Sequence, residues 1–140
     1  MMAIVDASVA AKWFFEEVHT EAALRLLDPR HRLYAPDFFL VEMDNVVCKR
    51  VRRGECTVAE GRKVRAALRQ VPVQMHPAVA LLDPAYEIAI RTDQSLYDCL
   101  YVALAMLVKG RMVTADRRFY EALAAGPFAK HGSWVEDLPR

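Results

Sequence analysis

The chain has 140 residues, of which 54% are hydrophobic and 26% charged, and its formal net charge is +1. This balance is typical of a globular protein, so we expect one domain over residues 1–140 and exclude a disordered chain. No apolar run reaches the ~18 residues that a bilayer-spanning helix needs, and no signal segment is evident. The three cysteines form no C-x-x-C pair, which argues against a zinc ribbon and favours a reducing, cytoplasmic location without membrane contact.

Short apolar segments alternate with helical patterns through the first half of the chain. In chain order we predict a strand at residues 3–5, helices at 8–15 and 20–27, a strand at 33–35 and a long helix at 37–53. The long helix carries basic residues near its C-terminal end, where the helix dipole favours them, and Gly54 stands just beyond. A Thr57-x-x-Glu60 capping box then begins a helix that runs to about residue 70.

The second half continues the alternation. We predict an edge strand at residues 71–75, helices at 85–91 and 96–108, a strand at 111–114, a helix at 117–125 and a last strand at 133–135. Asp83-Pro84 offers an N-cap for the first of these helices, and the second is apolar almost all round, which is typical of a buried helix. The pattern predicts a mainly parallel sheet covered on both faces.

Four acidic residues stand within or beside core-type sequence: Asp6, Glu42, Asp98 and Asp116. Asp6 and Asp116 follow predicted strands, and ligands gather beyond the carboxyl ends of parallel strands. Removing an ionised carboxylate from water is costly unless a cation meets it. We therefore expect the four side chains to share a divalent metal ion.

Each carboxylate also has a structural explanation. Asp at a strand-to-helix turn is a common N-cap, which accounts for Asp6 or Asp116 taken alone. Asp98 falls in the first turn of a buried helix, where N–H groups favour a negative charge, but this leaves its two flanking tyrosines unexplained. Glu42 is harder to account for, because it shares a helix face with apolar residues. Together the four favour a metal site over four separate structural roles.

The composition of this set favours a hard metal ion. Carboxylates with no accompanying His or Cys favour Mg²⁺ or Mn²⁺ over zinc. Such an ion activates water for attack on a phosphodiester and neutralises the developing charge. Without it, neighbouring carboxylates raise one another's pKa values, so metal binding is expected to depend on pH. The sequence contains no Gly-rich nucleotide-binding motif and no G-x-S-x-G elbow. It therefore gives no support for a nucleotide cofactor or for a serine nucleophile of that kind.

Positive charge is concentrated between residues 49 and 69. Eight Lys or Arg against two Glu give this segment a charge of +6, which leaves −5 for the rest of the chain. Arg62, Arg65 and Arg69 form one stripe of a predicted helix. A basic segment beside an acidic cluster suits an enzyme that acts on a polyanion, and the alternative is a pair of solvated helix faces.

Ordered motifs extend over nearly the whole chain. They are IVDASV at residues 4–9, Glu42 and Asn45 after Pro36, SLYDCLYVALA at residues 95–105 and VTAD at residues 113–116. This set resembles the signature of PIN-domain nucleases. Within that family it is most similar to the VapC toxins of bacterial and archaeal toxin–antitoxin pairs.

The resemblance implies a three-layer α/β/α sandwich and a Mg²⁺- or Mn²⁺-dependent endoribonuclease. It implies metal-binding and water-activating roles for Asp6, Glu42, Asp98 and Asp116, with polar support from Ser8 and Thr114. Asn45, three residues after Glu42 on the predicted helix, is a further supporting candidate from its spacing, and the basic stripe makes Arg62, Arg65 and Arg69 candidates for RNA-backbone contacts. The resemblance also implies a homodimer held by a cognate antitoxin protein whose C-terminal segment blocks the acidic site. Some relatives have a further acid where this chain has Arg118, which leaves the number of metal ions open.

Two other functions compete with this interpretation. A catalytically silent PIN-fold binding protein has no need for the complete acidic set. A receiver-like or phosphatase domain that uses Asp6 as a phospho-acceptor would have a second Asp at position 8, where this chain has serine.

The resemblance also places antitoxin contacts near the first helices, where Trp13, Phe14 and Phe15 stand together. These three side chains form either part of an apolar groove for the partner or ordinary core packing.

Overall fold

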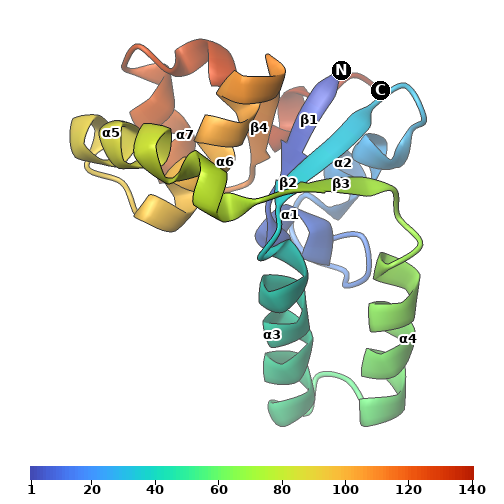
Figure 1. The fold of residues 1–140 in the computed structure, drawn as a ribbon. Coiled ribbons are helices and arrows are strands. Elements are labelled where there is room, and N and C mark those ends of the chain that lie inside the picture. Colours follow the sequence, from blue (N-terminus) through green and yellow to red (C-terminus); the bar gives the residue numbers. More distant parts are fainter.

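A five-stranded sheet forms the centre of the computed structural model, which describes residues 1–140 (Figure 1). Its strands are β1 (Met2–Val5), β2 (Arg32–Pro36), β3 (Val73–His76), β4 (Arg111–Thr114) and β5 (Gly132–Trp134). They lie in the order β3-β2-β1-β4-β5, and every neighbouring pair is parallel. The chain moves one way from β1 to β3 and the other way from β4 to β5, so strand order reverses between β1 and β4. Open sheets of this kind bind ligands at such a point.

Helices cover both faces of the sheet, so the predicted α/β class with a parallel sheet is confirmed. The α-helices are α1 (Ala7–Ala11), α2 (Thr20–Leu24), α3 (Phe39–Arg52), α4 (Val58–Leu68), α5 (Leu82–Thr92), α6 (Leu96–Val108) and α7 (Arg117–Ala124). Short 3₁₀ helices lie at Arg25–Leu27, Ala78–Leu81, Ala129–His131 and Val135–Asp137. None of the helices combines the length and the apolar character that crossing a bilayer requires.

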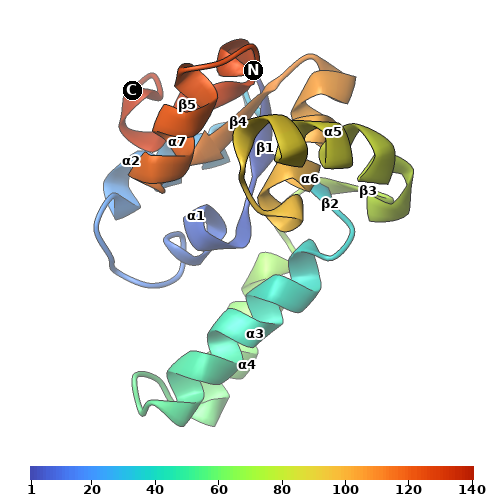
Figure 2. The same ribbon diagram turned by 90° about the vertical axis from the view of Figure 1, so that its left-hand side faces the viewer.

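The helices are arranged around the carboxyl ends of the strands. α6 packs across β1, β2 and β4, and α5 packs against α6. α5, α6 and α7 lie on one side of the sheet, and α1 and α2 lie on the other (Figures 1 and 2). α3 and α4 form a hairpin that projects beyond the carboxyl ends of the strands (Figure 1). The connections after β1, β2 and β4 therefore bring the starts of α1, α3 and α7 to this edge.

Local sequence explains where α4 and α6 begin. Thr57 Oγ1 accepts a hydrogen bond from Glu60 N at 3.0 Å, and Glu60 Oε1 accepts one from Thr57 N at 2.9 Å, so the predicted capping box forms. At the start of α6, Ser95 Oγ accepts from Asp98 N at 3.1 Å. α6 is buried from Cys99 to Ala105 and has the predicted bounds, because an all-apolar helix is stable only between other elements.

The predicted helix over residues 8–15 is too long. α1 ends at Ala11, and turns and a bend follow. The indole Nε1 of Trp13 donates to Ala23 O at 2.9 Å, which ties this turn to α2. Trp13, Phe14 and Phe15 are partly buried against the core. Packing of three consecutive aromatic side chains overrides helix propensity here, which favours core packing over an open apolar groove.

α5 begins earlier than predicted. Its N-cap is Leu81 and not Asp83, because the 3₁₀ helix over Ala78–Leu81 leads directly into it. Pro84 therefore occupies the third helical position, where its missing N–H removes no hydrogen bond, since the first N–H groups of a helix have no partner within it. Asp83 remains in the first turn and complements the helix dipole there.

The close approach of the α6–β4 connection to β1 gives a test of this packing. A Cβ added to Gly110 would lie 2.3 Å from Met2 O, so the backbone would have to shift. We expect Gly110→Ala to lower the free energy of unfolding by about 1–3 kcal/mol, the usual range for overpacking. Gly126→Ala is the matched control, because a Cβ there meets nothing within 4 Å. Urea denaturation of both variants measures the difference, and equal stabilities would contradict the close approach.

Candidate active site

The four predicted carboxylates come from neighbouring elements at the carboxyl edge of the sheet. Asp6 directly follows β1, and Asp116 follows the adjacent strand β4. Glu42 lies in the first turn of α3, which follows β2 on the other side of β1. Asp98 lies in the first turn of α6, which crosses all three of these strands. Strand order and helix starts thus bring residues far apart in sequence to one edge.

Asp6 is held by its own turn and influenced by two other acids. Its Oδ1 accepts from Val9 N and from Ser8 Oγ, each at 2.9 Å, so it caps α1. Desolvation raises the pKa of Asp6 from 3.8 to about 6 despite these two hydrogen bonds, and the nearby negative charges of Asp98 and Glu42 add to the shift. The side chain is therefore a partly buried carboxylate with like-charged neighbours and no ion pair.

Glu42 is held by a tyrosine from α6. The hydroxyl of Tyr101 donates to Glu42 Oε1 at 2.7 Å. Burial raises the pKa of Tyr101 well above its ordinary value, and the adjacent Glu42 raises it further, so the phenol remains a donor. Tyr97, by contrast, is exposed and packs edge-on against Phe38 at 5.9 Å between ring centroids. Of the two tyrosines that flank Asp98, one thus fixes Glu42 and the other packs edge-on against an aromatic ring.

Asp98 and Asp116 form the other end of the acidic cluster. Burial raises the pKa of Asp98, and the charge of Asp116 contributes. Asp116 is exposed, and its Oδ1 accepts from Phe119 N at 3.1 Å, so it caps α7. Thr114 Oγ1 accepts from Asp116 N at 3.0 Å, which fixes the turn between β4 and α7.

The capping explanation for Asp6 and Asp116 is correct, and it is compatible with a ligand role. Each uses Oδ1 for the cap, while Oδ2 accepts no hydrogen bond. A carboxylate has two oxygens, so a cap leaves one free for a cation. The cap also fixes the direction in which that free oxygen points.

The predicted supporting residues differ in their surroundings. Ser8 and Thr114 make the hydrogen bonds that position Asp6 and Asp116. Asn45 is exposed one turn beyond Glu42 on α3 and makes no side-chain hydrogen bond. Arg118 and Asp116 line a hollow of about 360 Å³ beside the cluster, so this chain has a cation next to the acidic edge.

Lys12 is a neighbour of the cluster that the sequence pattern did not reveal. Partial burial lowers the pKa of Lys12, and the charge of Asp6 opposes this shift. Its Nζ lies 3.2 Å from Glu17 Oε1, and Glu17 also pairs with Arg50. The guanidinium of Arg50 lies 4.3 Å from the centre of the Phe15 ring. This network depends on the turn after α1, which was predicted to be helical, so no periodic pattern could indicate it.

The donor chemistry fits a hard divalent cation. No three of the acidic, His or Cys side chains form a ready-made cage around an ion. Mg²⁺ does not need one, because proteins usually hold it through one or two carboxylates while it keeps several waters. The cluster offers only carboxylate oxygens, with no imidazole or thiolate that would favour zinc.

Comparison with known proteins identifies the family. The PIN domain model matches residues 3–123, so the chain belongs to the PIN-domain family. It is 32% identical to Ribonuclease VapC9 of Mycobacterium tuberculosis over 117 residues, which cover 84% of this chain and 87% of that protein. It is also 29% identical to Ribonuclease VapC3 of Pyrobaculum aerophilum over 127 residues, or 89% of this chain and 97% of the relative. Within the PIN-domain family, its relatives are thus VapC ribonucleases.

A solved structure has the same fold. The chain superimposes with a TM-score of 0.64 on a protein from a toxin–antitoxin complex of Klebsiella pneumoniae, covering 97% of this chain and 99% of that one. The sequence identity is 14%, so this likeness supports the PIN-type fold alone.

The raised pKa of Asp6 predicts how stability depends on pH in the absence of divalent metal. Between pH 3.8 and about 6 the folded protein binds more protons than the unfolded chain, so the free energy of unfolding falls as pH rises through this window. We expect Asp6→Asn, which keeps a capping oxygen, to be about 1–2 kcal/mol more stable than the wild type at pH 7 and equally stable near pH 4. Urea denaturation in chelator measures this, and parallel pH profiles for the two proteins would contradict it.

Proposed function

We propose that residues 1–140 form one nuclease domain and that the protein is a VapC-type endoribonuclease toxin, which hydrolyses RNA phosphodiesters. The observation that carries this proposal is the convergence of Asp6, Glu42, Asp98 and Asp116 where strand order reverses in a PIN-type sheet. The ribonuclease relatives at about 30% identity support it. Their names supply the substrate class, and the acidic edge supplies the chemistry.

In this proposal the four carboxylates hold Mg²⁺ or Mn²⁺ directly or through water. When bound, such a metal supplies an activated water and neutralises charge on the scissile phosphodiester. The protein positions the oxygens: Asp6 and Asp116 through the caps of α1 and α7, and Glu42 through the hydroxyl of Tyr101. Because the pKa of Asp6 is raised to about 6, protons compete with the cation at acidic pH.

RNA binding requires cations near this acidic edge. Of the three α4 candidates, Arg65 and Arg69 pair with Asp44 on α3 at 2.9 and 3.2 Å, so their charge is partly compensated, while Arg62 has no carboxylate partner. The helix face of Glu42 continues to Lys49 and Arg53, seven and eleven residues further on, and both are exposed and unpaired. We assign the path of the RNA backbone to Arg62, Arg65, Arg69 and these α3 cations.

Partner binding completes the proposal. A hollow of about 350 Å³ between α3 and α4 is lined by Val47, Val51 and Val58 and bordered by Arg52, Arg62 and Arg65. An apolar hollow with a basic rim suits an amphipathic, acidic segment of a cognate antitoxin. The protein of similar fold in the Klebsiella pneumoniae complex supports a partner of this kind.

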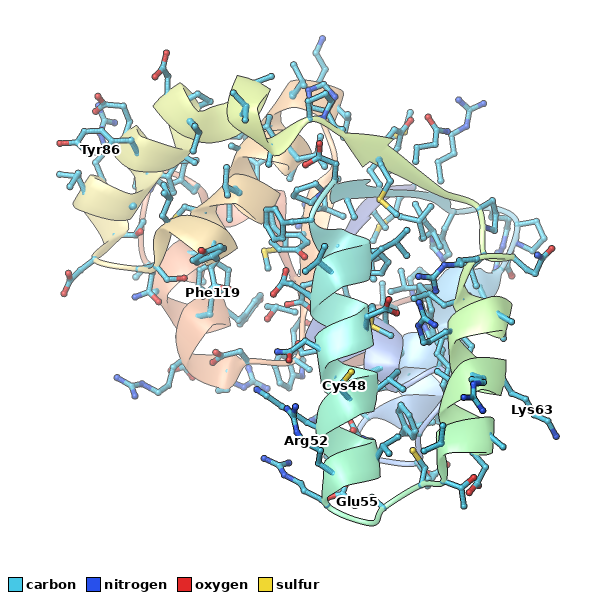
Figure 3. All side chains as sticks on the ribbon, turned by 60° about the horizontal axis from the view of Figure 1, so that its bottom comes forward. Cys48, Arg52, Glu55, Lys63, Tyr86 and Phe119 are labelled. Carbon is cyan, nitrogen blue, oxygen red and sulfur yellow. The ribbon has the colours of Figure 1, made fainter.

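A second copy of the chain is the proposed partner of α5. Val79, just before this helix, and Leu82, Tyr86 and Ile90 within it form an exposed apolar stripe at helical spacing. Tyr86 and Ile90 are 59% and 66% exposed, and Tyr86 projects away from the body of the molecule (Figure 3). An apolar stripe of this kind marks an interaction surface, and a homodimer would bury it.

Cleavage of cellular RNA tests the activity. We expect discrete fragments with Mg²⁺ or Mn²⁺ and none with chelator. Asp98→Asn should lower the rate at least about 100-fold, because a metal ligand contributes several kcal/mol to stabilising the transition state. Asp83→Asn is the matched control, since Asp83 is exposed in the first turn of α5 and remote from the cluster. Intact RNA with folded, antitoxin-free wild-type protein and either metal would contradict the proposal.

Tyr101→Phe tests whether the phenol positions Glu42. The variant keeps the buried ring and loses only the hydroxyl that donates to Glu42 Oε1. We expect the metal concentration for half-maximal rate to rise about 10–100-fold, as for other groups that orient a metal ligand, with little change in the KM for RNA. High metal concentration should restore much of the rate. A loss that metal does not relieve would indicate a different role for the hydroxyl.

A further inference from the structure

A basic hollow lies at the opposite end of the sheet from the acids. It has a volume of about 550 Å³ and is lined by Met106, Lys109, Gly110, Arg111, Lys130 and His131. Arg111 is the first residue of β4, and Lys130 and His131 lie in the 3₁₀ helix just before β5. Lys109 ends α6, eleven residues after Asp98, so about 17 Å of helix separates the hollow from the acidic cluster.

The hollow has positive charge without a counter-charge. No carboxylate lines it, and Lys109, Arg111 and Lys130 form none of the ion pairs in the structure. The C-terminal dipole of α6 accounts for a cation at position 109. It does not account for two more cations from β4 and from the turn before β5. Like charges gathered from three elements repel one another, and an anion in the hollow relieves that repulsion.

The remaining lining residues add hydrogen-bonding and apolar surface. His131 Nδ1 lies 3.1 Å from Gly110 O, and because a carbonyl oxygen only accepts, Nδ1 carries the proton. This hydrogen bond leaves Nε2 free for a ligand. Lys109 adopts a left-handed backbone at φ 57°, a position at a helix end where glycine is usual. A lysine there provides a charge at the hollow that glycine would not.

We propose that this hollow binds a phosphate of the RNA backbone away from the cleaved bond. The inference rests on the proposed function, since it takes RNA as the substrate and adds a second contact with it. Lys and Arg are the side chains that bind phosphate, and the exposed Met106 gives an apolar wall for a ribose or base. A strand within a duplex advances about 3.4 Å per phosphate, so the 17 Å measured through buried α6 corresponds to about five nucleotides of a helical RNA strand, and the path around the surface is longer. A folded RNA of tRNA size reaches both places, and a tetranucleotide in a helical conformation reaches only one.

Binding measured without cleavage tests this contact. In an Asp98→Asn background, Arg111→Gln and Lys130→Gln together remove two charges from the hollow. The control pair, Arg32→Gln and Lys63→Gln, removes two exposed charges that line neither the hollow nor the acidic edge, and Lys63 points away from the α3–α4 hairpin (Figure 3). Fluorescence anisotropy over a range of salt concentrations gives the affinity of each protein for unfractionated tRNA and for a tetranucleotide.

We expect the hollow pair to weaken tRNA binding about tenfold and to lower the slope of log K against log salt concentration by about 2, because each lost phosphate contact removes about one unit. Tetranucleotide binding should not change, and the control pair should have little effect. Lys130→Gln alone, which leaves the hydrogen bond from Arg111 to Gly132 O intact, should give about half the change in slope. Equal losses for hollow and control pairs, or no loss, would overturn the proposal. This experiment measures RNA binding and not cleavage. If the wild type failed to cleave RNA, the proposed nuclease function would be refuted, but the binding result for the hollow would still hold.

Discussion

Burial of neighbouring carboxylates is the constraint on which the rest of this site depends. β2, β1 and β4 are adjacent and parallel, so the residues that follow them meet at one edge, where α6 adds a fourth acid. Burial raises the pKa values of Asp6 and Asp98, and the charges of the neighbouring acids add to both shifts. A fold keeps such an arrangement only when other interactions stabilise each side chain. A bound cation is the direct way to offset the remaining cost of burying neighbouring negative charges.

The stabilising interactions here are ordinary ones. Two aspartates cap helices, and the glutamate accepts a hydrogen bond from a buried phenol. Capping and metal binding are therefore not alternatives at Asp6 and Asp116, because the cap uses one oxygen and orients the other. The same N–H groups that a helix start leaves unpaired thus fix the direction of the oxygen that we propose as a metal ligand. In the proposed role, the acids at these two strand-to-helix turns serve both structure and chemistry.

The sequence predicted the local features well. The strand at residues 111–114 and the helix at residues 96–108 have the predicted bounds, because continuous apolar runs and a serine cap determine them. The failures are non-local. α1 stops at Ala11 because Trp13 bonds to α2, and Tyr101 holds Glu42 across 59 residues of sequence. The pairing of Arg65 with Asp44 likewise depends on how α4 packs against α3, and no periodicity indicates it. The four acids themselves could be found because each followed or interrupted a core segment.

The distribution of charge matters more for a nuclease of this kind than the net charge of +1. An acidic edge repels RNA, and the metal ion that we propose for this edge would offset that repulsion only at the scissile phosphate. In our proposal, affinity for RNA comes from cations outside the acidic cluster: Lys49 and Arg53 further along α3, and the three cations of the hollow beyond the far end of α6. An enzyme uses binding energy from contacts remote from the reacting bond to hold its substrate in a site that would otherwise repel it. If these proposed contacts are made, a short RNA that misses the remote cations would be cleaved slowly, and a folded RNA that meets them would be the preferred substrate.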